Sequence, residues 1–265
     1  MSGVEELCTH YRHLGVERGR IVYVASDFGR MRENAVEAPE KMMSAHLEVL
    51  CDLVGSSGAI VVPTASLNLC NTDIAFDPAN TPSQGMGVFS EFVRRQPGAL
   101  RSFHPFWSVA SMGGVAASLV SDVSRHSFGA GSVWSRLVDA DALSLHVGVH
   151  PRLSFSVIHH VELAVGVPYR YTKEFMHPVR RTGIPQVEPF YHFVTYRDAD
   201  IERDGNVKIF ANFAEDPSLR ERQYARGRVF SFSMRRFFDA TQRLLVRDIY
   251  AWLRKEPTVR PYRFQ

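Results

Sequence analysis

The stretch APEKMMSAHLEVLCDLVGSSGAIVVPTAS, residues 38–66, predicts the class of fold. Residues 38–54 carry apolar side chains at helical spacing and meet Gly55, where a helix is expected to end. Residues 58–66 are rich in β-branched side chains and finish with a proline and small hydroxyl residues, which is typical of a buried strand. The stretch therefore predicts a helix followed by a strand.

The same order of elements occurs once before it. Residues 4–14 have helical spacing and stop at Gly15, and RIVYVAS, residues 20–26, indicates a buried strand. A helix and a strand that alternate twice favour parallel pairing of the strands, with the helices packed on the sheet. The sequence therefore predicts an α/β fold, three-layer-like, with a parallel or mixed sheet flanked by helices.

The rest of the chain adds further elements to this frame. These are a short helical piece at 88–95, a helix at 114–124, a strand at 142–149 and a last long helix at 233–255. The alternation weakens after Pro168, and the mixture of aromatic, proline and charged residues over about 170–232 predicts a flap or small β subdomain. No internal repeat divides the chain, so we expect a single domain over residues 1–265.

The composition of the chain limits the classes of protein to which it can belong. The 265 residues are 45% hydrophobic, enough for a sizeable core. No apolar run approaches the roughly 20 residues of a membrane span, and the N-terminus does not resemble a signal peptide, so we expect a cytoplasmic protein without a membrane partner. Cys8, Cys51 and Cys70 have no metal-type spacing, which predicts neither a disulfide framework nor a metal site.

The net charge of +3 is mild, but arginine is concentrated after residue 219. Such a segment suits the attraction of phosphates or, equally, the solvated outer face of helices. The chain carries no signature of a nucleic-acid-binding fold, and we expect no nucleic acid as a partner.

Several short elements, in a fixed order, carry a resemblance to a known family. They are Ser26 at the end of the first strand, Pro63 and Thr64, Pro82 and Ser83 with Met86 and Gly87, RSFHPFWS at 101–108, and Ser156, His159 and Glu162 with VPYR at 167–170. In order and spacing they resemble the aminoglycoside 3-N-acetyltransferase family, which is distinct from the GNAT acetyltransferases. The resemblance covers about two-thirds of the chain.

The resemblance implies an enzyme that uses acetyl-CoA as its cosubstrate and acetylates an amino group of an aminoglycoside-type antibiotic, at the 3-amino group or another position. It also implies that His159 is the general base. An alkylammonium group must lose a proton before it can attack a thioester. Histidine suits that task because its ordinary pKa, about 6.5, lies near neutral pH.

The stretch SVIHHVELAVGVPYR, residues 156–170, predicts how the base is supported. On a helix with Ser156 as N-cap and its end at Gly166, His159 and Glu162 lie three residues apart on one face. Glu162 is then the expected catalytic carboxylate behind His159. His160 diverges from its neighbour by about 100° and is expected to be packed or at the surface.

The resemblance also implies which residues line the acetyl-CoA channel. We expect cofactor contacts from Ser26, Ser83, Met86, Gly87, Arg101, Ser102, His104 and Ser108. Two alternatives stay open: His104 can instead tie its loop together, and Arg101 is either a phosphate-binding or a loop-anchoring group. No GxSxG elbow is present and Cys70 matches no motif, so we expect direct transfer in a ternary complex.

The acceptor is the part that the sequence defines least. A polycationic sugar needs carboxylates, and the candidates for substrate binding are Asp73, Asp77, Asp198, Asp200 and Glu202. Solvated loop charges are the alternative for these acids, and one of the last three could replace Glu162 behind His159. Two further hypotheses are an acceptor that is a nucleotide-linked amino sugar of surface polysaccharide, and a non-catalytic CoA-binding protein. A homodimer is common in such enzymes.

Overall fold

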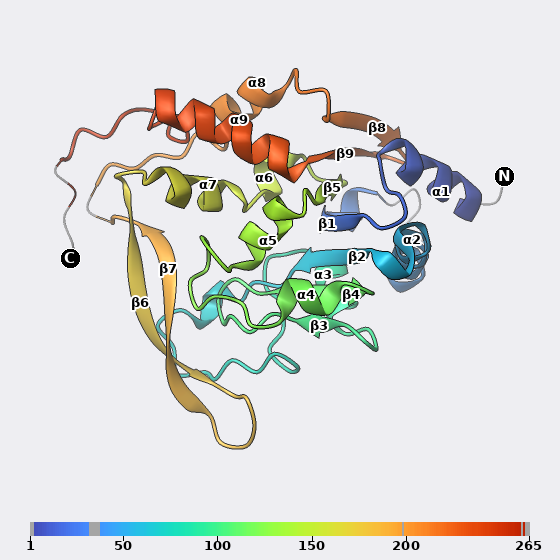
Figure 1. Ribbon diagram of the computed structural model, residues 1–265, viewed down its shortest axis with the longest axis horizontal. Coiled ribbons are helices and arrows are strands. Elements are labelled where there is room, and N and C mark those ends of the chain that lie inside the picture. Colours follow the sequence, from blue (N-terminus) through green and yellow to red (C-terminus); the bar gives the residue numbers. More distant parts are fainter. Residues whose placement is uncertain (1–2, 32–37, 198, 261, 263–265) are drawn as a thin grey trace.

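The computed structural model describes residues 3–31, 38–197, 199–260 and 262. Seven strands form one mixed sheet (Figure 1), in the order β3 (Leu100–Arg101), β4 (Val109–Gly113), β2 (Ala59–Pro63), β1 (Ile21–Ser26), β5 (Leu143–Val147), β9 (Gly227–Ser233) and β8 (Arg220–Tyr224). The central strand β1 is parallel to β2 and to β5, whereas β4 and β9 join these two in antiparallel orientation. The predicted parallel pairing and the mixed α/β sheet are confirmed.

Helices cover both faces of the sheet. One face packs against α1 (Gly3–His13), α2 (Pro39–Val54) and α3 (Val88–Arg94), and the other against α4 (Ala116–Val120), α5 (Val133–Asp139), α7 (Ile158–Val165), α8 (Val207–Phe213) and α9 (Met234–Arg247). Alternate side chains of β1 pack against the two groups of helices. Val22 and Val24 face the first group, and Tyr23 and Ala25 face the second. This arrangement gives the three layers.

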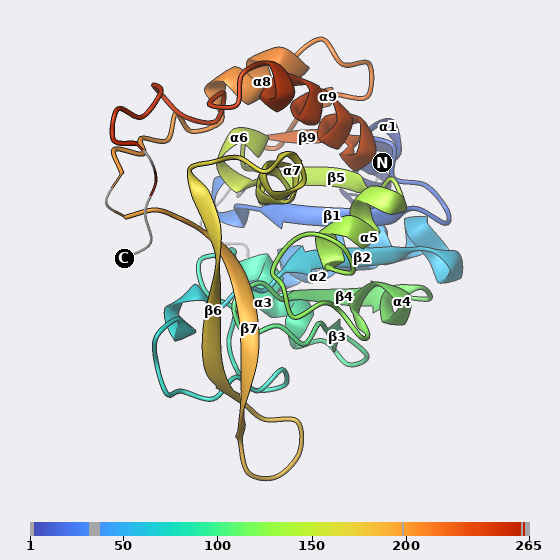
Figure 2. The ribbon, with the colours of Figure 1, turned by 60° about the vertical axis from the view of Figure 1, so that its left-hand side comes forward.

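A two-stranded hairpin leaves the body of the molecule. It consists of β6 (Arg170–Val179) and β7 (Gln186–Thr195), which form a separate sheet and extend past the edge of the main one (Figures 1 and 2). This hairpin lies within residues 170–232, for which the sequence predicts a flap or small β subdomain. Strands β8 and β9 belong to the main sheet, because β9 pairs with β5 and buries Phe232 in the core.

The last helix ends earlier than predicted. Helix α9 stops at Arg247, and Asp248 has an extended backbone with φ −132°. The Tyr250 N–H donates to Asp248 Oδ1 at 3.1 Å, a local turn that competes with the helix. Trp252 therefore lies in an irregular segment, from which it reaches the site described below.

In the described part of the chain, no helix combines the length and the apolar character that crossing a bilayer requires.

Buried histidines predict acid sensitivity. Burial lowers the pKa of several of them, including His10, His46 and His160, to about 4, and His104 and His146, to about 3. Below the ordinary value of 6.5 the unfolded chain takes up protons that the folded chain does not. We expect the free energy of unfolding, measured by urea denaturation, to fall steadily from pH 6.5 to about 4. A constant value over this window would contradict the prediction.

Candidate active site

A cavity of about 810 Å³ opens beyond the carboxyl ends of the central parallel strands. Its lining includes Ser26 at the end of β1, Pro63 at the end of β2 and Val149 just after β5. From β1 the chain reaches β2 through α2 on one face, and it reaches β5 through α5 on the other. Such a point, where connections change side, is where open α/β sheets bind ligands.

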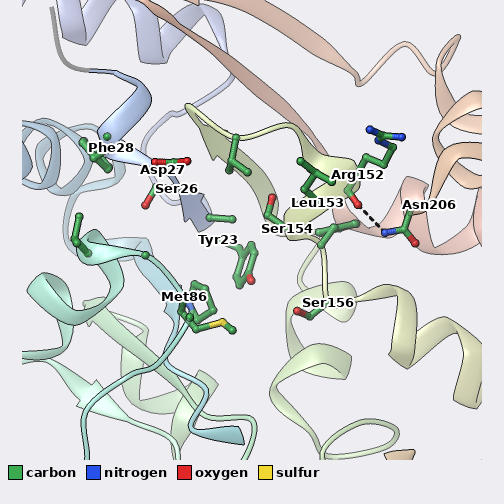
Figure 3. A pocket seen from close by; sticks show the side chains of 18 of the residues that line it. Tyr23, Ser26, Asp27, Phe28, Met86, Arg152, Leu153, Ser154, Ser156 and Asn206 are labelled. Carbon is green, nitrogen blue, oxygen red and sulfur yellow. Dashed lines mark hydrogen bonds between the residues drawn. The ribbon is translucent and has the colours of Figure 1, made fainter. Parts of the chain in front are cut away.

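The cavity has two walls that come from different parts of the chain. Figure 3 shows Ser26, Asp27, Phe28 and Met86 on one side of it. Arg152, Leu153, Ser156 and Asn206 lie on the other side, contributed by α6 (Pro151–Ser154), the segment before α7 and the loop before α8. His159 and Trp252 also line the cavity.

His159 meets the cavity from the first turn of α7. Its side chain is 17% exposed, and its Nδ1 lies 2.6 Å from Glu162 Oε2. A carboxylate only accepts hydrogen bonds, so Nδ1 carries the proton and Nε2 keeps its lone pair. Arg170 Nη2 lies 3.1 Å from the same Nδ1, which makes this contact a close approach of a cation rather than a second hydrogen bond.

Glu162 is a buried carboxylate with three partners. Besides His159, the Tyr169 hydroxyl donates to Oε1 at 2.9 Å, and Arg170 Nε lies 3.0 Å from Oε2. Burial alone would raise the pKa of Glu162, but the charge of Arg170 and the hydrogen bond from His159 lower it below its ordinary value. Glu162 therefore stays ionised, although its side chain has no exposed surface.

The same surroundings keep His159 neutral. Burial lowers its pKa below 6.5, the charge of Arg170 lowers it further, and Glu162 acts in the opposite direction. The ring is held edge-on by Phe128, at 5.5 Å between centroids, and by Trp252, at 5.6 Å. The result is a fixed, uncharged imidazole whose free nitrogen is available to accept a proton.

Helix α7 confirms one predicted boundary and corrects the other. It ends at Gly166, whose φ of 75° is left-handed, as expected. It begins at Ile158 with Val157 as N-cap and no side-chain cap, so the prediction of Ser156 as N-cap is wrong. Val157 already has helical backbone angles, and Ser156 contributes its carbonyl to His159 N–H at 3.1 Å while its side chain faces the cavity.

His160 is a packed residue, as expected. Its Nδ1 accepts the Gly129 N–H at 3.0 Å, and its ring lies against Phe238 at 5.3 Å. It is absent from the cavity lining, so only the first histidine of the pair serves the site.

Three of the predicted cofactor residues line the cavity: Ser26, Met86 and Gly87. Ser26 Oγ is buried and has no hydrogen-bond partner among the described residues, so a ligand in the cavity would satisfy it. Ser83 lies outside the lining, where its N–H donates to Glu91 Oε2 at 2.9 Å and holds the turn onto α3.

Gly87 and Gly85 form a matched pair for testing this wall. Both have left-handed φ, +84° and +72°, but a Cβ on Gly87 would lie 2.6 Å from the Ser26 carbonyl oxygen, whereas a Cβ on Gly85 meets nothing within 4 Å. We expect Gly85→Ala to cost about 1–2 kcal/mol of stability from backbone strain. Gly87→Ala adds a clash, so it should lose more stability and weaken CoA binding, as thermal melts and calorimetry would show. Equal losses in the two variants would refute the prediction that a side chain at Gly87 clashes with the Ser26 backbone.

The remaining predicted cofactor residues hold a loop together. Arg101 donates to the carbonyl oxygens of Thr64 (2.7 Å) and Thr81, and its Nε donates to Ser108 Oγ at 3.0 Å. Ser102 Oγ accepts the Val109 N–H at 2.9 Å. None of the three predicted residues lies in the cavity lining, and Arg101 has the loop-anchoring contacts that were one of its two interpretations.

His104 also holds its loop together through hydrogen bonds to the backbone. Its Nδ1 accepts the N–H groups of Phe106 and Trp107, at 3.2 and 3.1 Å, and its Nε2 lies 3.1 Å from the Arg125 carbonyl oxygen. The ring is buried away from the cavity lining.

The acidic candidates are not brought to the cavity. Asp77 caps its own turn by accepting the Ala79 N–H at 2.9 Å, and Asp73 is exposed near it. Asp200 accepts the Thr258 N–H at 2.9 Å, and Glu202 pairs with Lys255 at 3.0 Å. These four are absent from the lining, and Asp198 lies outside the described residues. The carboxylate behind His159 is Glu162.

Several residues of the site were not predicted from the sequence. Arg170 and Tyr169 stand in the VPYR segment, where the polar pair of tyrosine and arginine after a helix end was a usable signal. Arg203 stands within RDADIERD, a run in which only the acids attracted attention. Trp252 gave no signal, because only the irregular chain after α9 brings it to His159.

Over the ranges that the structure describes, no group of three or more His, Cys, Asp or Glu side chains is arranged to hold a metal ion.

Comparison with known proteins finds relatives of this chain. Over 95 residues the chain is 33% identical to aminoglycoside N(3)-acetyltransferase III of Salmonella sp, and over 114 residues it is 31% identical to aminoglycoside N(3)-acetyltransferase VII of Streptomyces paromomycinus. These matches cover 35% and 41% of this chain, and they span only about a third of the relatives' length, 33% and 38%.

Solved structures share the whole fold. The structure described as AAC-IIIb binary with CoASH superposes with a TM-score of 0.80 at 19% identity, covering 96% of this chain and 98% of that one. The structure described as AAC-VIa bound to sisomicin superposes with a TM-score of 0.78 at 20% identity, covering 91% and 96%. The sequence model described as aminoglycoside 3-N-acetyltransferase matches residues 24–246. The chain therefore belongs to the aminoglycoside 3-N-acetyltransferase family.

Proposed function

We propose that this protein transfers the acetyl group of acetyl-CoA to an amino group of an aminoglycoside-type sugar, with His159 as the general base. The observation that carries the proposal is the free Nε2 of a neutral His159, supported by Glu162, at the edge of a cavity beyond the strand ends. The family and the CoA-bound relative described above support the choice of donor.

The chain's own groups suit this chemistry. Bound acetyl-CoA would supply an activated acetyl group in a thioester. His159 Nε2 takes a proton from the acceptor's ammonium group and passes it to solvent, which frees the nitrogen lone pair. As the nitrogen–carbon bond forms and the carbon–sulfur bond breaks, the second proton of the nitrogen goes to the departing sulfur. Glu162 holds the imidazole in the tautomer that this role requires.

The wall formed by Ser26, Met86 and Gly87 is the proposed site of the CoA arm. The unpartnered Ser26 Oγ can donate a hydrogen bond to a carbonyl of the arm, and Gly87 lets its turn pack directly on the Ser26 backbone, where a Cβ would lie 2.6 Å from the carbonyl oxygen. The cavity volume of about 810 Å³ is in the range of sites that hold molecules of drug size or larger.

Two candidates for a covalent intermediate are unsuited to it. Ser154 lines the cavity and lies 2.9 Å from His146 Nδ1, but burial lowers the pKa of His146 to about 3, so this ring is a weak base. Burial raises the pKa of the Cys70 thiol to about 11, which keeps it protonated at neutral pH. Both observations favour direct transfer.

Release of the CoA thiol, followed with a thiol reagent across a panel of amines, tests the proposal. We expect thiol release from acetyl-CoA only when an amino sugar is present, with one acetyl group gained per thiol released, as measured by mass spectrometry. Stimulation by kanamycin or gentamicin supports an antibiotic as the acceptor, and stimulation by a nucleotide-linked amino sugar supports that alternative. CoA binding without stimulation by any amine would leave the non-catalytic hypothesis standing.

A further inference from the structure

Three side chains form a hydrogen-bonded chain that runs from the interior of the sheet to the cavity. In β5, His146 lies between two serines: its Nε2 is 2.8 Å from Ser144 Oγ, and its Nδ1 is 2.9 Å from Ser154 Oγ. Ser144 and His146 have no exposed surface, whereas Ser154, at the end of α6, lines the cavity. The buried polar groups therefore end in a hydroxyl that a ligand can reach.

The direction of these hydrogen bonds follows from Ser144. Among the residues that the structure describes, His146 Nε2 is the one hydrogen-bond partner of the Ser144 hydroxyl. A buried hydroxyl proton without an acceptor is unfavourable, so Ser144 donates and Nε2 accepts. Burial lowers the pKa of His146 to about 3, so the ring is neutral and carries its one proton on Nδ1. His146 Nδ1 then donates to Ser154 Oγ.

Ser154 is left with a proton of its own to donate. Its acceptor within the described part of the chain is the His150 carbonyl oxygen, 3.4 Å away, which is long for a hydroxyl donor. That oxygen already accepts the Leu153 N–H at 2.9 Å. A ligand oxygen at ordinary hydrogen-bonding distance would therefore be the better acceptor for the Ser154 hydroxyl.

The position of Ser154 favours the thioester carbonyl as the source of this oxygen. Ser154 and His159 are five residues apart, and the chain turns between them, because the Ser156 carbonyl accepts the His159 N–H at 3.1 Å. Both side chains line the cavity, and Figure 3 shows Ser154 and Ser156 beside it. The acyl carbon has to lie within reach of the amine that His159 deprotonates. Its oxygen can only accept, which matches a hydroxyl that already accepts from His146.

We propose that Ser154 is a catalytic hydrogen-bond donor to the carbonyl oxygen of the acetyl thioester, and that His146 and Ser144 are positioning residues that hold its hydroxyl in the donating orientation. This inference rests on the proposed N-acetyl transfer. When the amine nitrogen attacks, the carbonyl double bond opens and the oxygen gains negative charge, which Ser154 stabilises while it keeps its proton. When the carbon–sulfur bond breaks, the carbonyl forms again. A donor fixed in advance stabilises such charge most strongly.

Ser154→Ala removes the donor. We expect kcat to fall by about 100-fold to 1,000-fold, the usual cost of losing one donor to an oxyanion. The KM for the acceptor and the affinity for CoA should stay close to native. A fall in kcat of less than about 10-fold would overturn the inference. A higher KM for the acceptor at native kcat would also overturn it and assign Ser154 to acceptor binding.

Ser144→Ala tests the positioning role. Ser144 lies outside the cavity lining, so the change acts through His146, whose proton is then no longer fixed on Nδ1. We expect kcat to fall by about 10-fold, a part of the donor's contribution, with no further fall in the Ser154→Ala background.

Ser231→Ala is the matched control for Ser144→Ala. Ser231 is equally buried, lies on the neighbouring strand β9, and donates from its Oγ to the Leu14 carbonyl oxygen at 2.7 Å. Its loss should lower the melting temperature and leave kcat close to native. Equal kcat values in Ser144→Ala and Ser231→Ala, or a further loss in the double variant of Ser144 and Ser154, would overturn the positioning role.

A spectroscopic measurement separates this inference from the proposed reaction. Infrared difference spectra of the protein with acetyl-CoA, isotopically labelled at the carbonyl carbon and without an amine, report the carbonyl stretch of the bound thioester. A hydrogen bond lowers this frequency, so it should be lower in the native protein than in Ser154→Ala. If the frequencies differ but no amine releases thiol, the proposed reaction fails and the donor stands. If amines release thiol and the frequencies are equal, the reaction stands and the donor fails.

Discussion

Replacing His159 with alanine is expected to lower kcat/KM for acetyl transfer by about 100-fold to 10,000-fold, the range that a general base contributes. CoA binding, measured by calorimetry, should stay close to native, because the proposed CoA wall consists of Ser26, Met86 and Gly87 and does not include His159. The deficit should shrink as the pH rises, since a growing fraction of the acceptor amine then loses its proton to solvent without help. Turnover that survives at the native level would show that His159 is not the base.

The adjacent histidine is the control for this experiment. His160→Gln removes a buried ring of the same helix that accepts a backbone N–H and packs on Phe238, so it should lower the melting temperature. It should leave the pH dependence of kcat/KM as in the native protein, because His160 does not line the cavity. In the native protein, the acid limb of that profile should lie below pH 6.5, since the pKa of His159 is lowered.

The second large effect is expected at the buried charge pair behind the base. Glu162→Gln leaves the Arg170 guanidinium, whose side chain is 4% exposed, without its carboxylate. Breaking a buried pair by removing one partner typically costs about 3–5 kcal/mol. We expect the free energy of unfolding to fall by this amount, and Arg170→Met, which strands the carboxylate, to cost a similar amount.

The double variant decides whether the pair acts as a unit. Glu162→Gln combined with Arg170→Met removes both charges, so its loss of stability should be smaller than the sum of the two single losses by at least about 1 kcal/mol. It should not recover activity, because Glu162 also fixes the proton on His159 Nδ1. Additive losses in urea denaturation would argue against the pair as a coupled unit.

The strands and helices that the sequence predicts well are those with a long periodic pattern and a defined end. Residues 38–54 appear as α2 (Pro39–Val54), and the β-branched run after Gly58 appears as β2. Strand β4 was not predicted, because VASMG is short and rich in small residues. It exists through its pairing with β2, a contact between distant parts of the chain. Helix α5 has only seven residues, although Ser132, which accepts the Ser135 N–H, was a local signal for its start.

The residues of the site also fall into two groups: those that local sequence brings together and those that only the tertiary fold brings together. His159 and Glu162 lie on one helix, three residues apart, so helical geometry alone brings them into contact. Arg203 and Trp252 reach this pair through an isolated bridge between Arg203 and Leu253, which local sequence does not encode. Three of the acidic candidates are held by partners outside the cavity: Asp77 by the Ala79 N–H, Asp200 by Thr258 and Glu202 by Lys255.

The β6–β7 hairpin is held by an ion pair at its base and is exposed at its tip. At its base, Arg170 is locked to Glu162, but at its tip Ile184 is 81% exposed and a Cβ on Gly183 would meet nothing within 4 Å. Exposed loop tips of this kind tolerate insertions. A peptide epitope or a fluorophore placed in this turn, far from the cavity, would therefore offer a handle for immobilising or tracking the protein while its chemistry continues undisturbed.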